Sequence, residues 1–138
     1  MFLTKECDYG VRIIRALSGG EKKIVETICE TEHIPGQYAY KILKKLERAG
    51  LVQSIRGRNG GYLLQRPLSQ ITLLDIVSAI DSNLYVNECL REGHDCVNNR
   101  ETPCTVHIEF ERIQLAMQAE MSQTSMQILI DNAKIPVH

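Results

Sequence analysis

Three cysteines and one histidine stand in a single polar stretch at a spacing that suits metal binding. Six residues separate Cys89 from Cys96, seven separate Cys96 from Cys104, and two separate Cys104 from His107. Thiolates are soft ligands that suit iron–sulfur clusters, zinc or copper, and these gaps are longer than the Cys-x2-Cys spacing of structural zinc sites. When three ligands are thiolates and the fourth is of another type, the fourth ligand is the weaker one and exchanges more easily. The pattern therefore predicts a sensing metal site, with an iron–sulfur cluster and zinc as competing occupants.

Two other uses of these thiols compete with metal binding. Cys104 and His107 would form a nucleophilic pair, but no oxyanion hole or substrate pocket can be read beside them. We therefore predict a protein that is not an enzyme and takes no small-molecule substrate. Unligated thiols in a flexible loop are the other alternative, which is disfavoured because three of the five cysteines lie in a polar, glycine-containing stretch. Cys7 and Cys29 are predicted to be structural.

Composition places these residues in one domain of a reducing compartment. The chain has 138 residues, of which 43% are hydrophobic and 24% charged, the balance of a globular protein. Its apolar runs are short, and its start has no signal-peptide core. We therefore expect a cytoplasmic protein without a membrane segment. In a reducing compartment, cysteines bind metals or take part in redox chemistry more often than they form disulfides.

The near-neutral net charge of −1 hides a strong asymmetry along the chain. Residues 1–66 carry a net charge of +5 and residues 67–138 a net charge of −6. Within residues 37–66, seven bases accompany a single acid, Glu47. A protein surface normally mixes its signs, so this concentration predicts a binding site for a polyanion. The alternative is that it balances the acidic half of a partner subunit.

Helical periodicity predicts three helices in the basic half, over residues 9–18, 25–32 and 37–49. In the third helix the apolar residues recur at one helical interval. The bases recur at the same interval on the other side: Lys41, Lys44, Lys45 and Arg48. One face should dock on a core while the other faces outward.

A hairpin with a basic tip follows the third helix. Strands are predicted over 51–55 and 62–65, joined by a tight turn that holds Arg56, Arg58 and Asn59. Three helices and such a hairpin describe a winged helix-turn-helix, a mainly α fold with a small β-hairpin. Its third helix would enter the major groove of double-stranded DNA, and its hairpin would reach the backbone or the minor groove.

The acidic half predicts a loop and a dimerisation helix. Thr72 and Asp75 form an acidic capping box before a helix over 73–80, after which periodicity is lost. A helix over 105–121 has an apolar face too wide for a core already built, so pairing with a second copy is expected; the alternative is that it folds back on its own domain. A last helix is predicted over 124–133. The chain thus divides into a DNA-binding domain (1–80), a cluster-binding loop (81–104) and a dimerisation region (105–138).

Several motifs resemble those of the bacterial Rrf-two-type winged-helix regulators over nearly the whole chain. The most specific is the wing, Arg56-Gly57-x2-Gly60-Gly61-Tyr62. Others are Leu3-Thr4 with Tyr9, Tyr40-Lys41-Ile42-Leu43, Leu46-x3-Gly50-Leu51-Val52, the stretch from Ile71 to Ile80, and the three-cysteine loop. The resemblance implies a homodimeric transcription regulator with an iron–sulfur cluster on the loop cysteines.

The resemblance also implies roles for single residues. Arg56 matches the wing arginine that enters the minor groove in this family, and major-groove contacts fall on Tyr38, Tyr40, Lys41 and Lys44. With the neighbouring Lys45, Arg58 and Asn59 these form the predicted DNA-binding set.

The fourth cluster ligand has two candidates by resemblance. His107 matches the Cys-x2-His of members with a [2Fe-2S] cluster, and Asp8 matches an acid that completes a [4Fe-4S] site from the other subunit. The second cysteine gap departs from the common five residues, which leaves the ligand set open. We favour His107 and [2Fe-2S], because imidazole suits this iron better than a hard carboxylate.

The predicted function is a DNA-binding regulator that acts as a repressor. Its operator binding would be controlled by a cluster that senses iron–sulfur status, redox state or nitric oxide. The alternative is a cluster-free regulator of the same fold, controlled by a protein partner or by thiol oxidation.

Overall fold

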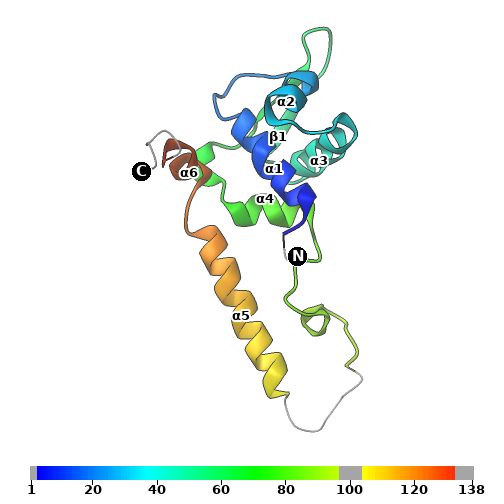
Figure 1. Cartoon of the computed structure of the whole chain (residues 1–138), viewed down its shortest axis with the longest axis vertical. Coiled ribbons are helices and arrows are strands. Elements are labelled where there is room, and N and C mark those ends of the chain that lie inside the picture. The colour runs from blue at the N-terminus through cyan, green and yellow to red at the C-terminus, as the bar shows by residue number, and fades with distance from the viewer. Residues whose placement is uncertain (1–2, 97–103, 133–138) are drawn as a thin grey trace.

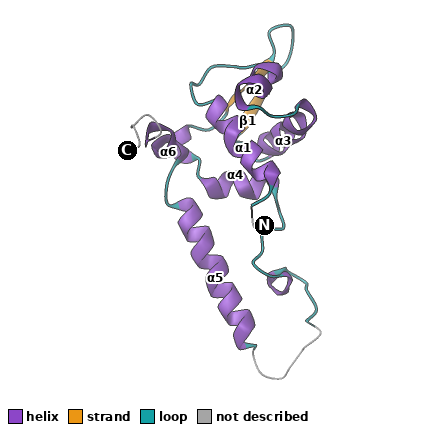
Figure 2. Cartoon of the chain, viewed as in Figure 1, coloured by secondary structure: helices purple, strands orange, loops and turns teal. Residues whose placement is uncertain are grey.

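The structure is a computed structural model, which describes residues 3–96 and 104–132. Helices predominate and one antiparallel hairpin accompanies them (Figures 1 and 2), as the sequence predicts. The elements in chain order are α1 (Lys5–Ala16), α2 (Val25–Glu32), α3 (Gly36–Arg48), β1 (Val52–Ile55), β2 (Gly61–Leu64), η1 (Leu68–Gln70), α4 (Leu73–Ile80), η2 (Glu88–Leu90), α5 (Thr105–Ser122) and α6 (Met126–Asn132).

Helix α1 is the centre of the core and contacts α2, α3 and α4. Its residues Ile13 and Ile14 are fully buried, as are Ile42 and Leu43 of α3. Burial of each such side chain contributes about 1.5–3 kcal/mol. At Gly10, a Cβ atom would lie only 2.0 Å from the Cδ1 of Ile80. A glycine at this position therefore lets α1 and α4 approach closely.

Helix α1 begins earlier than its apolar periodicity predicts. The expected span was 9–18, whereas the helix starts at Lys5 because the Thr4 side chain caps it by accepting from the Cys7 N–H. The additional turn carries Glu6 and Asp8 on its surface. Both acids therefore have a helical position rather than a place in a disordered start.

The wing is a short hairpin with tight backbone constraints. Strand β1 pairs with β2 from Val52 opposite Leu64 to Ile55 opposite Gly61; β1 lies inside its predicted span, and β2 begins and ends one residue earlier than predicted. Gly57 in the turn has a φ of +108°, a conformation that side chains rarely adopt. Lys23, before α2, exchanges two backbone hydrogen bonds with Tyr62, of 2.9 and 2.8 Å, which ties the hairpin to the helical core.

Two further predictions hold at the junction of the domain and the tail. The capping box of α4 is present, with Thr72 and Asp75 each bonding the other's backbone N–H. Helix α6 lies inside the predicted span 124–133, of which residue 133 falls outside the described residues. The N–H of Met126 donates to the carbonyl of Ile71 at 2.7 Å, so the tail returns to the part of the chain that precedes α4.

Helix α5 leaves the domain and presents apolar side chains to solvent (Figure 1). Leu115 is 60% exposed and Val106 57% exposed, and Ile108 is exposed as well. The segment that follows α4 runs beside α5 and carries η2 against it. Within the described ranges, no helix is long and apolar enough to cross a membrane.

The capping box supplies a first prediction. We expect Thr72→Ala to lower the free energy of unfolding by about 1 kcal/mol, because the Asp75 N–H loses its acceptor. Urea denaturation followed by circular dichroism measures this. Thr72→Ser keeps the hydroxyl and should retain most of the stability; equal losses in the two variants would contradict a capping role.

Candidate nucleic-acid interface

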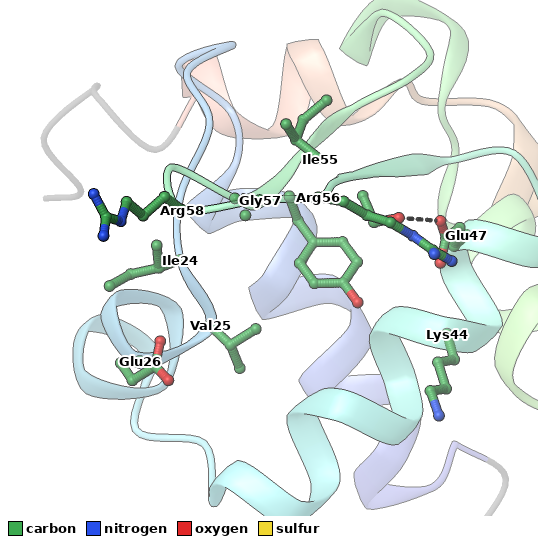
Figure 3. Close-up of a pocket in the computed structure, with 13 residues that line it drawn as sticks. Ile24, Val25, Glu26, Lys44, Glu47, Ile55, Arg56, Gly57 and Arg58 are labelled. Atoms are coloured by element: carbon green, nitrogen blue, oxygen red, sulfur yellow. Dashed lines mark hydrogen bonds between the residues drawn. The ribbon is translucent and has the colours of Figure 1, made fainter.

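Helix α3 and the wing frame an open groove of about 460 Å³ (Figure 3). The N-terminal part of α2 closes one side of the groove, and Lys44 of α3 lines the other. Arg56 and Arg58 reach the groove from the turn of the wing, and both are exposed. In the view of Figure 3, Arg56 extends toward α3 while Arg58 extends away from it. The two arginines of the hairpin therefore extend in different directions.

Three bases that line this groove, and a fourth one turn further along α3, keep their charge unneutralised. In the described part of the chain, no acid lies within ion-pair distance of Lys44, Arg48, Arg56 or Arg58. All four side chains belong to exposed residues. A set of free cations on one face attracts a polyanion over roughly a Debye length, about 8 Å at physiological salt.

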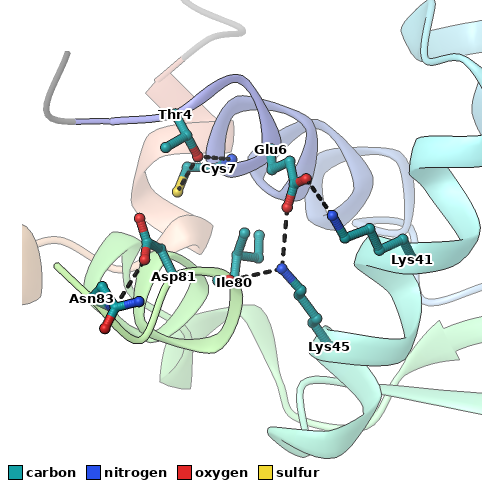
Figure 4. Close-up of polar contacts among 8 residues, drawn as sticks. All are labelled: Thr4, Glu6, Cys7, Lys41, Lys45, Ile80, Asp81 and Asn83. Atoms are coloured by element: carbon teal, nitrogen blue, oxygen red, sulfur yellow. Dashed lines mark hydrogen bonds and ion pairs between the residues drawn. The ribbon is translucent and has the colours of Figure 1, made fainter.

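Lys41 and Lys45 are engaged differently, although the sequence places them in the same basic stripe. Both contact Glu6 of α1, with Nζ to carboxylate distances of 2.8 Å for Lys41 and 3.1 Å for Lys45 (Figure 4). Hydrogen bonds from Lys41 and then Lys45 hold the pKa of Glu6 below its ordinary value. The basic face of α3 is therefore divided between free and paired lysines.

Lys45 also connects three helices. Its ammonium group donates to the carbonyl of Ile80 at 3.1 Å as well as to Glu6. Ile80 is the last residue of α4. The cysteine segment, by which we mean the stretch from Asp81 that carries Cys89 and Cys96, begins immediately after it. Lys45 thus joins α3 to α1 and to the start of that segment.

The predicted aromatic contacts occupy two environments. The ring of Tyr38 packs on that of Tyr9 with centroids 5.7 Å apart, while Tyr40 is 49% exposed. At the wing tip, the carbonyl of Asn59 accepts a hydrogen bond from Lys22. Tyr40 is therefore the more accessible of the two tyrosines.

The groove also contains acids, which limit where an anion can lie. Glu26 and Glu47 both line it. Glu47 accepts a hydrogen bond of 2.6 Å from the hydroxyl of Ser54, which fastens β1 to α3. Burial first, and then the charge of Glu47, raise the pKa of Tyr62. Among the bases that line the groove, Lys44 and the two wing arginines have no acid within ion-pair distance in the described residues.

The four predicted metal ligands of the loop lie on two elements. Cys89 belongs to η2 and is partly buried, whereas Cys96 is exposed. Cys104 is the N-cap of α5 and His107 lies in its first turn. Residues 97–103 of the predicted loop lie outside the described residues. All three cysteines are free thiols.

The donor set fits an iron–sulfur cluster in its chemistry, since it offers three thiols and an imidazole. Within residues 3–96 and 104–132, however, no three His, Cys, Asp or Glu side chains stand close enough to hold a metal ion. Asp8 lies on α1, where its carboxylate pairs with Arg12 at 2.9 Å and with Lys5 at 3.5 Å. A single chain thus supplies suitable ligands without gathering them.

The two remaining cysteines are structural, as predicted. Cys7 is 1% exposed in the core and accepts a hydrogen bond from the Thr4 hydroxyl. Cys29 packs at the edge of the core, and burial, followed by the charge of Glu26, raises the pKa of its thiol.

Two polar residues of this structure are absent from the sequence prediction. Glu6 neutralises lysines 35 and 39 positions away, a distance at which no local pattern gives a signal. Gln114 is the buried residue of α5. The same helix holds a second amide, Gln118, so no local signal in the sequence singles out Gln114.

The fold and this surface define a winged-helix protein whose basic helix and hairpin lie on one face. The chain belongs to the Rrf2 family of iron-dependent transcriptional regulators, whose model matches residues 3–132. Members are DNA-binding transcriptional regulators and not enzymes. The family resemblance read from the sequence is thereby confirmed.

Relatives and solved structures agree with this assignment. The chain is 38% identical to protein aau3 of Rhizobium meliloti over 70% of its own length and 64% of the relative's. It is 30% identical, over 98% of its length and 90% of the relative's, to a Haemophilus influenzae protein assigned by name to the HTH-type transcriptional regulators.

Two solved structures share the fold over most of the chain. IscR of T. potens superimposes with a TM-score of 0.75 at 18% identity, over 99% of this chain and 93% of that one. CymR of B. subtilis, the global cysteine regulator, does so with a TM-score of 0.72 at 25% identity, over 94% and 96%.

The pH dependence of stability tests the ion pairs of Glu6. Because its pKa is lowered in the folded state, the pairs stabilise the protein above the ordinary glutamate pKa, and this stabilisation is lost as pH falls through the lowered value. We expect Glu6→Gln to reduce the urea midpoint at neutral pH and to match the wild type at acidic pH. The control is Glu30→Gln, an exposed glutamate of α2. A pH-independent difference would exclude the ion pairs as its source.

Proposed function

We propose that the chain is a homodimeric repressor that binds duplex DNA through α3 and the wing. Its affinity for an operator is set by an iron–sulfur cluster held by the cysteine segment. The observation that carries the DNA-binding half is the set of free cations at Lys44, Arg56 and Arg58, which line the groove, with Arg48 one turn beyond Lys44 on α3. Membership of the Rrf2 family of iron-dependent transcriptional regulators supports both the DNA-binding half and the cluster half of this proposal.

The division of the lysines refines the predicted DNA contacts. Lys44 is exposed and free, so it neutralises a phosphate without first losing another partner. Lys41 is exposed but must exchange Glu6 for a phosphate, and Lys45, with two internal acceptors, holds the helix rather than the DNA. Tyr40, at 49% exposure, extends the same face toward the base edges.

Salt dependence distinguishes these roles. We expect Lys44→Ala to weaken binding to all duplexes similarly and to reduce the slope of log K against log salt by about one unit. Fluorescence anisotropy with labelled duplexes at several salt concentrations measures the slope. Arg112→Ala on α5 is the control and should leave it unchanged. An unaltered slope for Lys44→Ala would remove this lysine from the interface.

The wing makes a different contact. A narrow A/T-rich minor groove has an enhanced negative potential that attracts arginine, and the turn of the wing carries Arg56 and Arg58. We expect Arg56→Ala to weaken binding most at A/T-rich flanks, whereas Lys44→Ala weakens it uniformly. A panel of duplexes with A/T-rich or G/C-rich flanks compares the two variants; the same loss on every duplex would contradict minor-groove insertion.

We propose that a second copy of the chain packs against the exposed apolar side chains of α5. The helix has 18 residues, with large apolar side chains exposed along it at Val106, Ile108, Ile113 and Leu115. Because positions two apart on a helix point to opposite sides, Val106 and Ile113 expose one side of α5 and Ile108 and Leu115 the other. Exposed apolar surface is unfavourable in water at about 25 cal/mol for each Å². Pairing would also set the separation of two recognition helices on DNA.

Disruption of the apolar face tests this pairing. We expect the wild type to sediment as a dimer and Leu115→Asp to sediment as a monomer with unchanged circular dichroism. The control substitution is Glu111→Asp, at an exposed polar position of the same helix. A monomeric wild type would contradict the proposed dimer.

The cluster half of the proposal is supported by the donor set. Cys89, Cys96 and Cys104 would hold the cluster with His107 as fourth ligand, or with Asp8 of a second copy in its place. When bound, such a cluster supplies a centre that responds to iron, oxidants and nitric oxide. The protein's own part is to order the segment between α4 and α5. That segment starts next to Ile80, where Lys45 holds the recognition helix.

Anaerobic purification tests the cluster directly. We expect a brown protein with visible absorbance, and Cys96→Ser should remove most of the iron. Mössbauer spectra of the wild type separate [2Fe-2S] from [4Fe-4S]. A colourless protein with stoichiometric zinc would overturn the proposal.

The cluster-free alternative has its own support. Cys96 and Cys104 are exposed free thiols, and the chain is as similar in fold to CymR of B. subtilis as to IscR. In this case thiol oxidation or a protein partner would control DNA binding. Anaerobic protein without iron whose operator affinity changes with a mild oxidant would favour it.

A further inference from the structure

The side chain of Gln114 joins α5 to the segment that leads to Cys89. We propose that Gln114 is a positioning residue, which fixes Cys89 beside the helix that carries Cys104 and His107. This inference rests on the proposed function, because it takes these three residues as parts of one metal site.

The contact consists of one amide and two backbone groups. The Oε1 atom of Gln114 accepts from the N–H of Val86 at 2.8 Å, and its Nε2 atom donates to the carbonyl of Leu84 at 2.9 Å. The amide therefore binds the segment as the edge of a neighbouring strand would. Gln114 is only 7% exposed, whereas the other residues of α5 are exposed or partly exposed.

Burial makes this contact specific. A buried amide that loses its partners is costly, so the segment cannot slide along α5 by one residue without leaving a donor and an acceptor unpaired. Leu84 packs against the core and fixes the other side of the segment. The register between segment and helix is thus set at this point.

The register extends from the clamp to Cys89. The side chain of Asn87 accepts from the N–H of Cys89 at 3.1 Å and starts η2, and η2 packs against α5. Figure 1 shows the segment running opposite to α5, toward the end where that helix begins. From Gln114 to His107 the helix rises about 10 Å, and three residues from Val86 to Cys89 span at most about 10 Å. Cys89 therefore lies between the level of Gln114 and the start of α5, on the element that packs against that helix.

Cys89 is also the protected thiol of the three. It is partly buried while Cys96 and Cys104 are exposed, which agrees with a fixed position on α5. Cys89 would then be one ligand whose position on α5 is fixed in advance, although Cys89, Cys104 and His107 do not stand close enough together in the described chain to hold a metal ion. Cys96 would complete the site from the exposed part of the segment.

Two variants of the full-length protein test the clamp. Gln114→Met keeps the length of the side chain and removes both hydrogen bonds. Gln114→Glu keeps the acceptor for Val86 and places an oxygen against the carbonyl of Leu84. The control is Gln118→Met, one turn further along α5, where the described residues offer the side chain no hydrogen bond to the segment.

The first readout needs no metal. We expect alkylation of Cys89 in the metal-free protein, followed by mass spectrometry, to become about tenfold faster in Gln114→Met and unchanged in the control. The rates at Cys96 and Cys104 should not change. The second readout is the iron retained after anaerobic reconstitution, which should fall severalfold in both Gln114 variants.

The outcomes separate this inference from the proposed function. Faster alkylation of Cys89 in a protein that binds no iron would keep the clamp and overturn the cluster. Iron retained equally by wild type and both variants, with an unchanged Cys89 rate, would overturn the clamp and keep the cluster. If Gln114→Met does not fold, Gln114→Glu decides by the same two measurements.

Discussion

The close contact of α1 with α3 and α4 is the constraint on which the other features depend. Ile13 and Ile14 of α1 are buried against these helices, and Gly10 permits an approach that a Cβ atom would block. With α3 fixed on its apolar face, its basic face must point outward. The same packing brings the first turn of α1 beside α3, so that Glu6 meets Lys41 and Lys45.

Helix packing, rather than sequence position, therefore decides which lysines have an ion-pair partner. Two neighbouring lysines of α3 differ in their partners. Lys44 lines the groove without an ion pair, whereas Lys45 donates hydrogen bonds to the Glu6 carboxylate and the Ile80 carbonyl. Free cations serve a polyanion, and paired ones connect helices. This division places a polar link between α3 and the segment that carries the cysteines.

The outer half of the molecule has the opposite character. Helix α5 presents apolar side chains to solvent and buries an amide, Gln114. The apolar face calls for a second copy, and the buried amide holds the cysteine segment in register. Assembly and sensing would thus share one helix, which is a compact arrangement for a regulator of the Rrf2 family.

The sequence by itself determined most of the fold, because the signals are local. The apolar interval in α3, the hairpin signal before and after the wing turn and the Thr72–Asp75 capping box each act within a few residues, and the structure has all three elements. The start of α1 was missed because its cap, Thr4, precedes the periodic residues. The tertiary structure alone decided the partners of Lys41, Lys45 and Gln114. Those contacts join residues 28 to 39 positions apart, and such contacts depend on how helices pack rather than on any local pattern.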